Sequence, residues 1–555
     1  MKLNGSDILV ECLLEQGVDT VFGYPGGSVL NIYDALYKYR DRLTHVLTAH
    51  EQGASHAADG YARSTGKVGV CIATSGPGAT NLVTGIATAY MDSIPIVAIT
   101  GNVSVSLLGR DSFQEVDITG ITMPVTKHNF IVKSVEELAD TVRSAFLIAQ
   151  SGRPGPVLID IPKDVTAAIT DYEPQPAVTP RPYTPPKEER LEMALELLRT
   201  CERPLIYFGG GVISSGAEEE LLALATQQDI PVCSSMMGLG GFPAAHPLWL
   251  GMVGMHGTLA ANRAARECDM LLVCGARFSD RVAGNRTGFA PNAKVVHIDI
   301  DHAEFDKNVA AAVRLAGNLK DVLALLAQRS QPRQHTEWVT STAACKRTYT
   351  PDWSNAEAVP DPLAILYKLR ELTDDDVVIA TDVGQHQMWT AQHFEIRRPR
   401  TFLTSGGLGT MGYGLGAAIG GQYGCPNSRT VLISGDGSFH MNLNELTTLA
   451  SYNLPIVVLV MNNRVLGMVR QWQKTFYGSR FSATDPHRKT DLVKLAEAFG
   501  CTGMRITKTG DIEPVLRAAL AANGPVVVDC QISPDANVLP MIPPGGTVAD
   551  IIEEM

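Results

Sequence analysis

Short apolar runs rich in valine and isoleucine recur along this chain, and they constrain its fold more than any other feature. Examples are IPIVAITG at 94–101, GPVLIDIP at 155–162, RTVLISGDG at 429–437 and LPIVVLVMNN at 454–463. The runs do not alternate between apolar and polar residues, which indicates strands buried on both faces. A turn signal and a helical pattern follow each run. The sequence therefore predicts an α/β fold of doubly wound parallel sheets covered by helices.

Two proline-containing stretches interrupt this rhythm and divide the 555-residue chain. Residues 171–189 carry six prolines, which favours an extended connector over a packed element. Residues 330–362 are polar, with prolines near both ends and a short possible helix between them. We therefore predict three α/β units at 1–165, 190–328 and 362–530, followed by a tail at 531–555.

Charge and cysteine usage exclude several classes of protein. The net charge of −12 argues against nucleic acid or an anionic membrane as the main partner, although a local phosphate site remains compatible with it. The ten cysteines are scattered without a C-x-x-C pair, which indicates free thiols in a reducing compartment. The start of the chain has no signal-peptide pattern, and apolar stretches such as 455–461 are too short to span a bilayer. We expect a soluble cytoplasmic protein.

The segment LISGDGSFHMN ends a buried strand on a single carboxylate between two glycines. Asp436 is followed 27 residues later by Asn463, which ends the next apolar run. Ligands of parallel sheets bind beyond the carboxyl ends of the strands, so these two side chains should lie close together. Carboxylate and amide oxygens suit Mg²⁺ that also binds a substrate diphosphate. A simple turn and a strand cap are the alternative interpretations.

A third glycine-rich segment, GGLGTMG at 406–412, contains G-x-G-x-x-G before an apolar helical pattern. By itself this pattern would suggest a Rossmann dinucleotide site, but an isolated match is weak. The same unit begins with a run that ends in DVGQHQ at 382–387. We interpret both segments as loops that contact the phosphates and ring of one ligand.

These segments resemble the diphosphate-binding half of thiamine-diphosphate enzymes, in which G-D-G is followed by N or N-N. Such enzymes need a glutamate from another unit at the start of a helix, and Glu51 heads the alanine-rich helical stretch HEQGASHAADGYARSTG. The resemblance implies that Glu51 hydrogen-bonds the cofactor's aminopyrimidine and takes part in general acid–base catalysis. Stabilising the helix dipole is the alternative role for this carboxylate.

The resemblance extends over nearly the whole chain to the catalytic subunits of the acetohydroxyacid synthase (acetolactate synthase) family. The stretches that carry it are VFGYPGGSVLNIYDAL, TSGPGATNLVTGIATAYMDSIPIVAITG, SFQEVDI, GRPGPVLIDIPKDV, GMHG, GARFSDRV, DVGQHQMW, SGGLGTMGYGLGAAIG and NNRVLGMVRQWQ. By this resemblance the units are a pyrimidine-binding, a central FAD-binding and a diphosphate-binding domain.

The resemblance also assigns roles to individual residues. It implies thiamine diphosphate contacts at Gly384, Gln385, His386, Gly409, Met411, Gly435, Asp436, Gly437, Ser438, Asn463 and Met468. It implies Mg²⁺ ligands at Asp436, Asn463 and the Val465 carbonyl, with Gln114 and Lys163 joining Glu51 as catalytic residues. It implies substrate contacts at Phe113, Arg281 and Trp472. A core methionine, an exposed arginine and a helix-face tryptophan are the plain alternatives for Met411, Arg281 and Trp472.

The central domain of this family binds FAD, which takes no redox part in the reaction. The residues that the resemblance places near it are Arg153, Gly210, Gly211, Met255, His256, Gly275, Arg277, Arg281 and Asp299. Three positions depart from the family pattern. Ser279 replaces an aspartate, Gly416 replaces a proline, and Asn102 stands in the family's G-Q-V. The first departure falls in the motif that separates flavin-containing from flavin-free acetolactate synthases.

The implied reaction decarboxylates pyruvate and transfers its acetaldehyde unit to a second pyruvate or to 2-oxobutyrate. It belongs to valine, leucine and isoleucine biosynthesis. The resemblance further implies a homodimer or homotetramer and a separate small regulatory subunit. A pyruvate oxidase, a flavin-free catabolic acetolactate synthase, a Rossmann dehydrogenase and an inactive binding protein are the rival interpretations. Retention of Glu51, Asp436 and Asn463 argues against an inactive protein.

Overall fold

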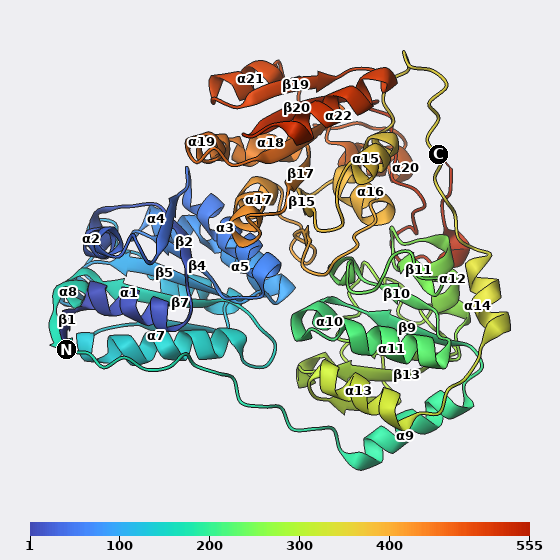
Figure 1. Ribbon diagram of the computed structural model, residues 1–555, viewed down its shortest axis with the longest axis horizontal. Coiled ribbons are helices and arrows are strands. Elements are labelled where there is room, and N and C mark those ends of the chain that lie inside the picture. Colours follow the sequence, from blue (N-terminus) through green and yellow to red (C-terminus); the bar gives the residue numbers. More distant parts are fainter. Residues whose placement is uncertain (555) are drawn as a thin grey trace.

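A computed structural model describes residues 1–554 and divides them into three α/β units (Figure 1). Each unit contains one six-stranded sheet in which every neighbouring pair of strands is parallel. The strand orders are β3-β2-β4-β5-β7-β6, β11-β10-β9-β12-β13-β14 and β16-β15-β17-β18-β20-β19. Helices cover the faces of these sheets, which confirms the predicted doubly wound fold.

The elements of the N-terminal unit, blue to cyan in Figure 1, come first in chain order. They are β1 (Lys2–Asn4), α1 (Gly5–Glu15), β2 (Thr20–Gly23), α2 (Leu30–Lys38), β3 (Thr44–Leu47), α3 (Glu51–Thr65), β4 (Gly69–Ala73), α4 (Pro77–Asn81), α5 (Val83–Asp92), β5 (Ile96–Asn102), α6 (Ile118–Thr122), β6 (His128–Ile131), α7 (Val135–Gln150), β7 (Val157–Pro162), α8 (Lys163–Ala167) and β8 (Ile169–Asp171). β1 and β8 form a separate antiparallel pair.

The central unit is green to yellow in Figure 1, and the C-terminal unit is orange to red. The central elements are α9 (Glu188–Thr200), β9 (Pro204–Phe208), α10 (Gly210–Ser215), α11 (Glu218–Gln228), β10 (Val232–Ser234), β11 (Trp249–Met252), α12 (Leu259–Glu267), β12 (Met270–Cys274), β13 (Lys294–Asp299), β14 (Val313–Ala316), α13 (Leu319–Arg329) and α14 (Thr336–Ala343). The C-terminal elements are α15 (Pro362–Glu371), β15 (Val378–Thr381), α16 (Gln385–His393), β16 (Phe402–Leu403), α17 (Tyr413–Gly424), β17 (Thr430–Gly435), α18 (Asp436–Asn442), α19 (Leu446–Ser451), β18 (Ile456–Asn462), α20 (Gly467–Phe476), α21 (Leu492–Ala498), β19 (Thr502–Ile506), α22 (Ile512–Ala521) and β20 (Val526–Gln531).

The N-terminal and C-terminal units share one hydrophobic core, built around helices α3 and α17. Glycines bring these two helices to backbone distance. A Cβ on Gly60 would lie 2.3 Å from the Ala417 carbonyl oxygen, and one on Gly420 would lie 1.9 Å from that of Ala57. A Cβ on Gly416 would lie 2.6 Å from His56 Cβ. The glycine that departs from the family pattern therefore stands where the two helices leave no room for a side chain.

The first connector is extended, whereas the second, residues 330–362, contains the short helix α14. Residues 172–187 form no helix or strand and lead from the N-terminal to the central unit, as Figure 1 shows. The tail beyond β20 returns along the central unit, and its Ile542 amide donates a 2.8 Å hydrogen bond to the Met255 carbonyl. Of the helices in residues 1–554, none combines the length and the apolar character needed to cross a membrane.

Candidate functional site

The glycine-flanked aspartate lies at the carboxyl edge of the C-terminal sheet. β17 and β18 are parallel neighbours, and Gly435 pairs with Met461 in their register. Asp436 follows as the first residue of α18, and only 6% of its side chain is exposed. The guanidinium of Arg488 lies 3.4 Å from its carboxylate. Burial raises the pKa of Asp436 to about 6, while the Arg488 charge opposes that rise. Arg488 does not fully offset the cost of burying this carboxylate, so its charged form would be stabilised further by a bound cation.

Asn463 lies one residue beyond the neighbouring strand and belongs to a buried amide network. Its side-chain oxygen accepts a hydrogen bond from the Val465 amide at 3.1 Å, and its nitrogen donates to Gln385 Oε1 at 3.2 Å. The Gln385 nitrogen donates to Gln471 at 3.0 Å and to the Ala536 carbonyl at 2.8 Å. The Gln385 side chain is thus occupied by protein partners. The first-turn amides of α16 stay available for an anion because no side chain caps this helix.

A buried histidine packs under the same turn. A Cβ on Gly435 would lie 2.8 Å from His386 Nδ1, so only glycine fits above the ring. Burial lowers the pKa of His386 to about 3, which keeps the ring neutral. Its Nε2 is buried and has no hydrogen-bond partner within residues 1–554. Gly384 precedes α16 with a φ of +156°, and Ser438 Oγ donates to the Val383 carbonyl at 2.8 Å.

Met411 lies on the loop before α17, half-buried and close to the aspartate turn. Its Cε is 3.8 Å from where a Cβ on Gly437 would stand. The next residue, Gly412, donates its amide to Asp382 at 2.7 Å, and Ser434 Oγ donates to the same carboxylate at 3.0 Å. Burial raises the pKa of Asp382 to about 6. One buried carboxylate therefore ties the methionine loop to the strand that leads to Asp436.

Three further predicted residues lie on or near this edge. Gly409 has a φ of +70° in the methionine loop. Met468 and Trp472 are both half-buried on α20. The Trp472 ring meets Phe476 edge-on, with the ring centroids 5.4 Å apart.

Glu51 begins α3 at the carboxyl edge of the N-terminal sheet. Its Oε2 accepts a hydrogen bond from Asn81 at 3.0 Å. A Cβ on Gly78 would lie 3.1 Å from Oε1, so the glycine keeps that oxygen accessible. The buried Glu445 of the C-terminal unit accepts the amides of the two residues before Glu51, at 3.1 and 3.0 Å. No hydrogen bond or ion pair within residues 1–554 joins Glu51 to Asp436.

The other residues predicted for the reaction chamber follow the carboxyl ends of neighbouring strands in the N-terminal sheet. Phe113 lies in the connection after β5 and is 87% exposed. Gln114 has a φ of +57°, and its carbonyl oxygen would lie 2.9 Å from a Cβ on Gly76, which follows β4. Lys163 directly follows β7 and is exposed. These three residues therefore face the same edge as Glu51.

Close glycine contacts mark the corresponding edge of the central sheet. A Cβ on Gly211 would lie 2.6 Å from Gly275 Cα, and the Gly211 amide donates to the Gly275 carbonyl at 3.0 Å. Gly275 has a φ of +54°, and Gly210 begins α10. Asp299 ends β13 and accepts the Asp301 amide at 2.9 Å. The turns after β9 and β12 thus pack backbone to backbone, without side chains between them.

Two arginines predicted for the flavin site connect the central unit to the N-terminal unit. Arg153, from the N-terminal unit, donates to Glu304 of the central unit at 3.0 Å. Arg277, from the central unit, donates to the Met91 carbonyl at 2.7 Å. Both side chains hold the two units together in this structure.

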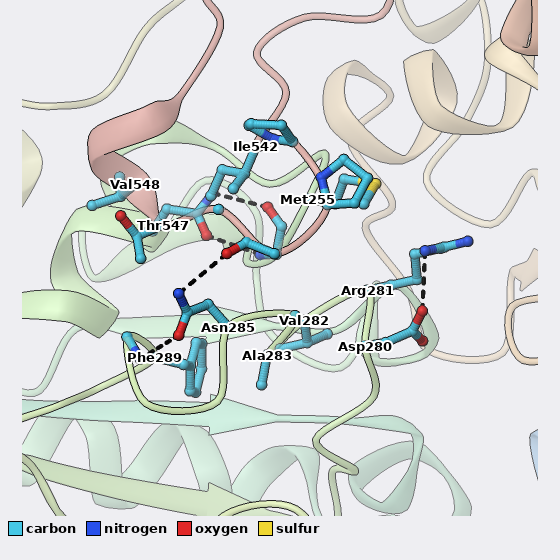
Figure 2. Close-up of a pocket in the computed structure, with 18 of the residues that line it drawn as sticks. Met255, Asp280, Arg281, Val282, Ala283, Asn285, Phe289, Ile542, Thr547 and Val548 are labelled. Atoms are coloured by element: carbon cyan, nitrogen blue, oxygen red, sulfur yellow. Dashed lines mark hydrogen bonds and ion pairs between the residues drawn. The ribbon is translucent and has the colours of Figure 1, made fainter. Parts of the chain in front are cut away.

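A pocket opens between the central unit and the tail (Figure 2). The Met255 amide donates to the Arg281 carbonyl at 2.8 Å, and the Met255 carbonyl accepts Ile542 of the tail. The Arg281 guanidinium pairs with Asp280 at 3.0 Å and is 65% exposed. His256 is buried, its pKa is lowered to about 4 by burial, and its Nδ1 lacks a partner in the part of the chain that is described. Met255, predicted for the flavin site, and Arg281, predicted for both the flavin and the substrate, line this pocket, and His256 follows Met255 in the chain.

Sequence reasoning missed three residues that organise the site. Asp382 follows a buried strand and precedes a glycine by two positions, so the reasoning that selected Asp436 could have found it. Glu445 and Arg488 follow no such pattern. Their partners, the turn before Glu51 and the Asp436 carboxylate, become neighbours only in the folded chain.

Domain comparisons agree with this geometry. The chain matches the N-terminal TPP (thiamine pyrophosphate) binding domain of thiamine pyrophosphate enzymes at residues 3–121. It matches their central domain at 191–326 and their C-terminal TPP binding domain at 382–530. The chain belongs to the thiamine pyrophosphate enzymes, whose cofactor is also called thiamine diphosphate.

Full-length relatives narrow the family. The chain is 48% identical to a probable acetolactate synthase large subunit of Methanocaldococcus jannaschii, over 99% of this chain and 95% of that protein. It is 47% identical to the acetolactate synthase isozyme 2 large subunit of Escherichia coli, over the whole of both chains. It is 45% identical to the acetolactate synthase large subunit of Corynebacterium glutamicum, over 99% of this chain and 90% of that protein.

The residues at the C-terminal edge fit a magnesium–diphosphate group. Asp436 offers a buried carboxylate, Asn463 an amide oxygen, and His386 an unpartnered buried nitrogen. The helices α16 and α18 begin here without side-chain caps. A cavity of about 330 Å³ adjoins Asp436 on the side of β18 and β20. No group of three or more His, Cys, Asp and Glu residues that could bind a metal occurs in residues 1–554.

The residues at the central edge also fit a cofactor with polar atoms. Ser234 Oγ, at the end of β10, is buried and lacks a partner in the described chain, as does His256 Nδ1. Ser279, the departure from the family pattern, is exposed. Its carbonyl accepts the amides of Val282 and Ala283 at 3.1 and 2.8 Å, so the turn is formed by the backbone.

Proposed function

We propose that this chain is the catalytic subunit of an acetolactate synthase. It converts two molecules of pyruvate into 2-acetolactate and carbon dioxide, and pyruvate with 2-oxobutyrate into 2-aceto-2-hydroxybutyrate and carbon dioxide. The observation that carries the proposal is identity of 45–48% to acetolactate synthase large subunits over almost the whole chain. The placement of Asp436 and Asn463 at neighbouring strand ends supports it.

Thiamine diphosphate, when bound, supplies a nucleophilic carbon and accepts the electrons that decarboxylation releases. Asp436, Asn463 and the Val465 carbonyl would hold Mg²⁺, which in turn holds the diphosphate. The first-turn amides of α16 and α18 would donate hydrogen bonds to the diphosphate oxygens. Met411 would support the cofactor rings from the loop before α17.

Glu51 is the proposed proton carrier. Asn81 fixes Oε2 by donating a hydrogen bond to it, so Oε1 would be the oxygen that is free to exchange a proton with the cofactor's aminopyrimidine. Gly78 keeps the approach to Oε1 open. Glu51 and Asp436 belong to different units, and in the family that this chain resembles these two units come from different subunits, so that each active site lies between two copies. We therefore propose a homodimer or a larger assembly such as a homotetramer.

Residues that contact the substrate are proposed from all three units. Gln114, Lys163 and Phe113 would line the chamber above the cofactor and limit the entry of water. Arg281 would form a bidentate pair with the carboxylate of the second 2-oxo acid, in competition with Asp280. Trp472 would pack against the alkyl group of that substrate.

FAD is proposed as a third cofactor, bound at the edge of the central sheet. The buried unpartnered atoms of Ser234 and His256 support a ligand there. The closely packed glycine turns would let its phosphates approach the backbone. Ser279 favours the alternative of a flavin-free acetolactate synthase, because it replaces an aspartate of the flavin-containing family.

The partners and location are also proposed. The names of the relatives, which call them large subunits, support a separate small regulatory subunit. The chain has a net charge of −12 and free cysteines, which support a cytoplasmic enzyme without nucleic acid or membrane as a partner.

The decisive experiment incubates the purified chain with pyruvate, Mg²⁺ and thiamine diphosphate, with and without FAD. Acetolactate, acetaldehyde and acetyl phosphate are measured in parallel. We expect acetolactate only when FAD is present. Acetolactate without flavin would establish the flavin-free alternative, and acetyl phosphate would indicate a pyruvate oxidase. Failure to form acetolactate under either condition would refute the proposed function.

A further inference from the structure

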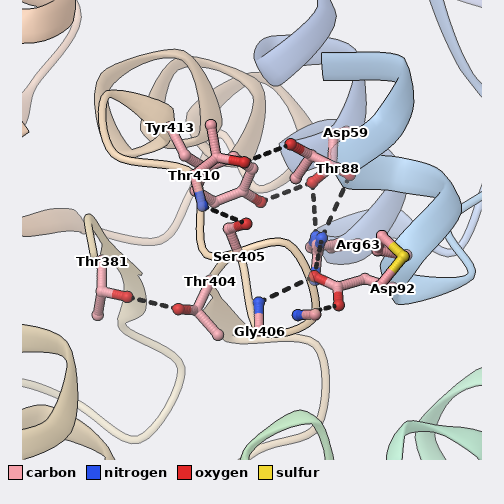
Figure 3. A network of polar contacts seen from close by, with 12 residues as sticks. Asp59, Arg63, Thr88, Asp92, Thr381, Thr404, Ser405, Gly406, Thr410 and Tyr413 are labelled. Carbon is pink, nitrogen blue, oxygen red and sulfur yellow. Dashed lines mark hydrogen bonds and ion pairs between the residues drawn. The ribbon is translucent and has the colours of Figure 1, made fainter. Parts of the chain in front are cut away.

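The methionine loop, residues 405–412, is held by the N-terminal unit of the same chain (Figure 3). Asp92 ends α5, and its side chain is fully buried. Its carboxylate accepts the amides of Gly406 and Gly407 at 3.0 and 2.7 Å. Two consecutive loop amides thus point at one carboxylate that belongs to another domain.

Arg63 fixes the orientation of that carboxylate. Its Nη2 lies 2.9 Å from Asp92, and its Nε lies 2.5 Å from Asp59. The Arg63 side chain is 5% exposed and that of Asp59 is fully buried. Tyr413, the first residue of α17, donates its hydroxyl to Asp59 at 2.6 Å. One guanidinium balances only one of the two carboxylates, so the loop amides and the tyrosine hydroxyl provide the remaining donors.

Two more contacts fix the residues on both sides of Met411. Thr410 shares a 2.8 Å hydrogen bond with Thr88 of α5. Gly412 donates its amide to Asp382 of its own unit. The methionine is therefore flanked by one residue that the N-terminal unit holds and one that the C-terminal unit holds. Its position depends on how the two units meet.

We propose that Asp92, oriented by Arg63, is a positioning residue that sets the methionine loop and thereby the affinity for thiamine diphosphate. The proposal rests on the proposed use of this cofactor and deepens it. Arg63 lies on α3, the helix that begins with Glu51, and the loop carries Met411. One buried charge cluster thus fixes both the glutamate helix and the methionine loop.

The first test measures loop order without any cofactor. Hydrogen exchange of peptide 404–413 is followed by mass spectrometry in the full chain and in Asp92→Asn. Hydrogen bonds to a charged acceptor are worth about 1.5–3 kcal/mol, so we expect about tenfold or faster exchange in the variant. Glu15→Gln is the matched control. It weakens another buried ion pair, with Arg143 at 3.0 Å, that makes no contact with the loop.

The second test measures the dissociation constant of thiamine diphosphate by titration in the presence of Mg²⁺. We expect a rise of about tenfold for Asp92→Asn and less than about twofold for Glu15→Gln. Arg63→Lys keeps the positive charge but loses the paired N–H donors of the guanidinium, so it should give an intermediate rise in the dissociation constant. It is the test variant to use if Asp92→Asn does not fold. Unchanged loop exchange, or equal effects of both changes, would overturn the proposal. Faster exchange with an unchanged dissociation constant would overturn it too. Neither measurement requires acetolactate to be formed, so failure of this proposal can be distinguished from failure of the proposed reaction.

Discussion

The carboxyl edges of the C-terminal and central sheets have the same strand geometry but use their polar residues differently. At the C-terminal edge, Asp436, Asp382 and Asn463 are buried, and hydrogen bonds link them to loops of the same unit. At the central edge, Arg153 and Arg277 bond to the neighbouring unit across the boundary. These polar side chains of the first edge are organised from within the unit, although its methionine loop is also held by the N-terminal unit, whereas the arginines of the second edge depend on how the domains are placed.

This difference bears on what each edge can bind. Where the polar groups of a site are already hydrogen-bonded to one another, ligand binding loses little conformational entropy. Such a site suits a small, highly charged group such as a metal diphosphate. A site assembled at a domain boundary suits a long ligand that contacts several units. The comparison predicts that changes at the C-terminal edge affect catalysis, while changes at the central edge affect flavin binding.

The largest effect is expected from Glu51→Gln, which tests whether the C-terminal edge works without the N-terminal unit. The amide cannot exchange a proton as a carboxylate does, so acetolactate formation should fall by about 10²–10⁴-fold. The measurement is kcat at saturating cofactor. Glu137→Gln is the control, because Glu137 also lies in the first turn of a helix and shares the interaction with the helix dipole. Equal losses in both variants would reduce Glu51 to a helix-stabilising role.

Asp436→Asn should give the next largest effect, at the edge that is organised from within. Removing the charge should raise the Mg²⁺ concentration for half-maximal activity by at least about 100-fold, because even residues that only orient a metal ligand contribute 10–100-fold. Titration of activity with Mg²⁺ measures this. Asp535→Asn provides the control, since Asp535 pairs with Arg470 in an exposed position. An unchanged Mg²⁺ requirement would place the metal elsewhere.

Sequence alone could predict the elements whose signal is local. The apolar runs gave the parallel strands, and the glycine-flanked Asp436 together with Asn463 gave one edge of the site. The predicted domain limits and residue roles stay predictions. Arg488 could not be found, because its partner lies 52 residues away and no spacing rule joins them. The interaction of Asp92 with Gly406 was equally invisible, since 314 residues separate them.

A moderate effect is expected where α3 meets α17, the contact that brings the two units together. Gly416→Ala would place a Cβ 2.6 Å from His56 Cβ and 2.8 Å from the Gly53 carbonyl oxygen. Such overpacking should lower the free energy of unfolding by about 1–3 kcal/mol, measured by chemical denaturation. Gly27→Ala is the control, because a Cβ there would meet no atom within 4 Å. A stable Gly416→Ala variant would mean that the two helices can separate at little cost.

The smallest effect is expected at the central edge, from Ser279→Asp. The serine is exposed, and its backbone carbonyl already forms the turn with Val282 and Ala283. Restoring the aspartate of the family should therefore change stability by less than about 0.5 kcal/mol and FAD affinity by less than about threefold, measured by flavin fluorescence.

The contrasting change at this edge is Gly211→Ala. Its Cβ would stand 2.6 Å from Gly275 Cα, so a backbone turn would have to move. We expect FAD affinity to fall by about tenfold or more, because overpacking of a close contact costs about 1–3 kcal/mol. If Ser279→Asp instead converts a flavin-free protein into a flavin-binding one, the side chain controls flavin binding there. A carboxylate would then control binding at the central edge, as we propose that Asp436 does at the C-terminal edge.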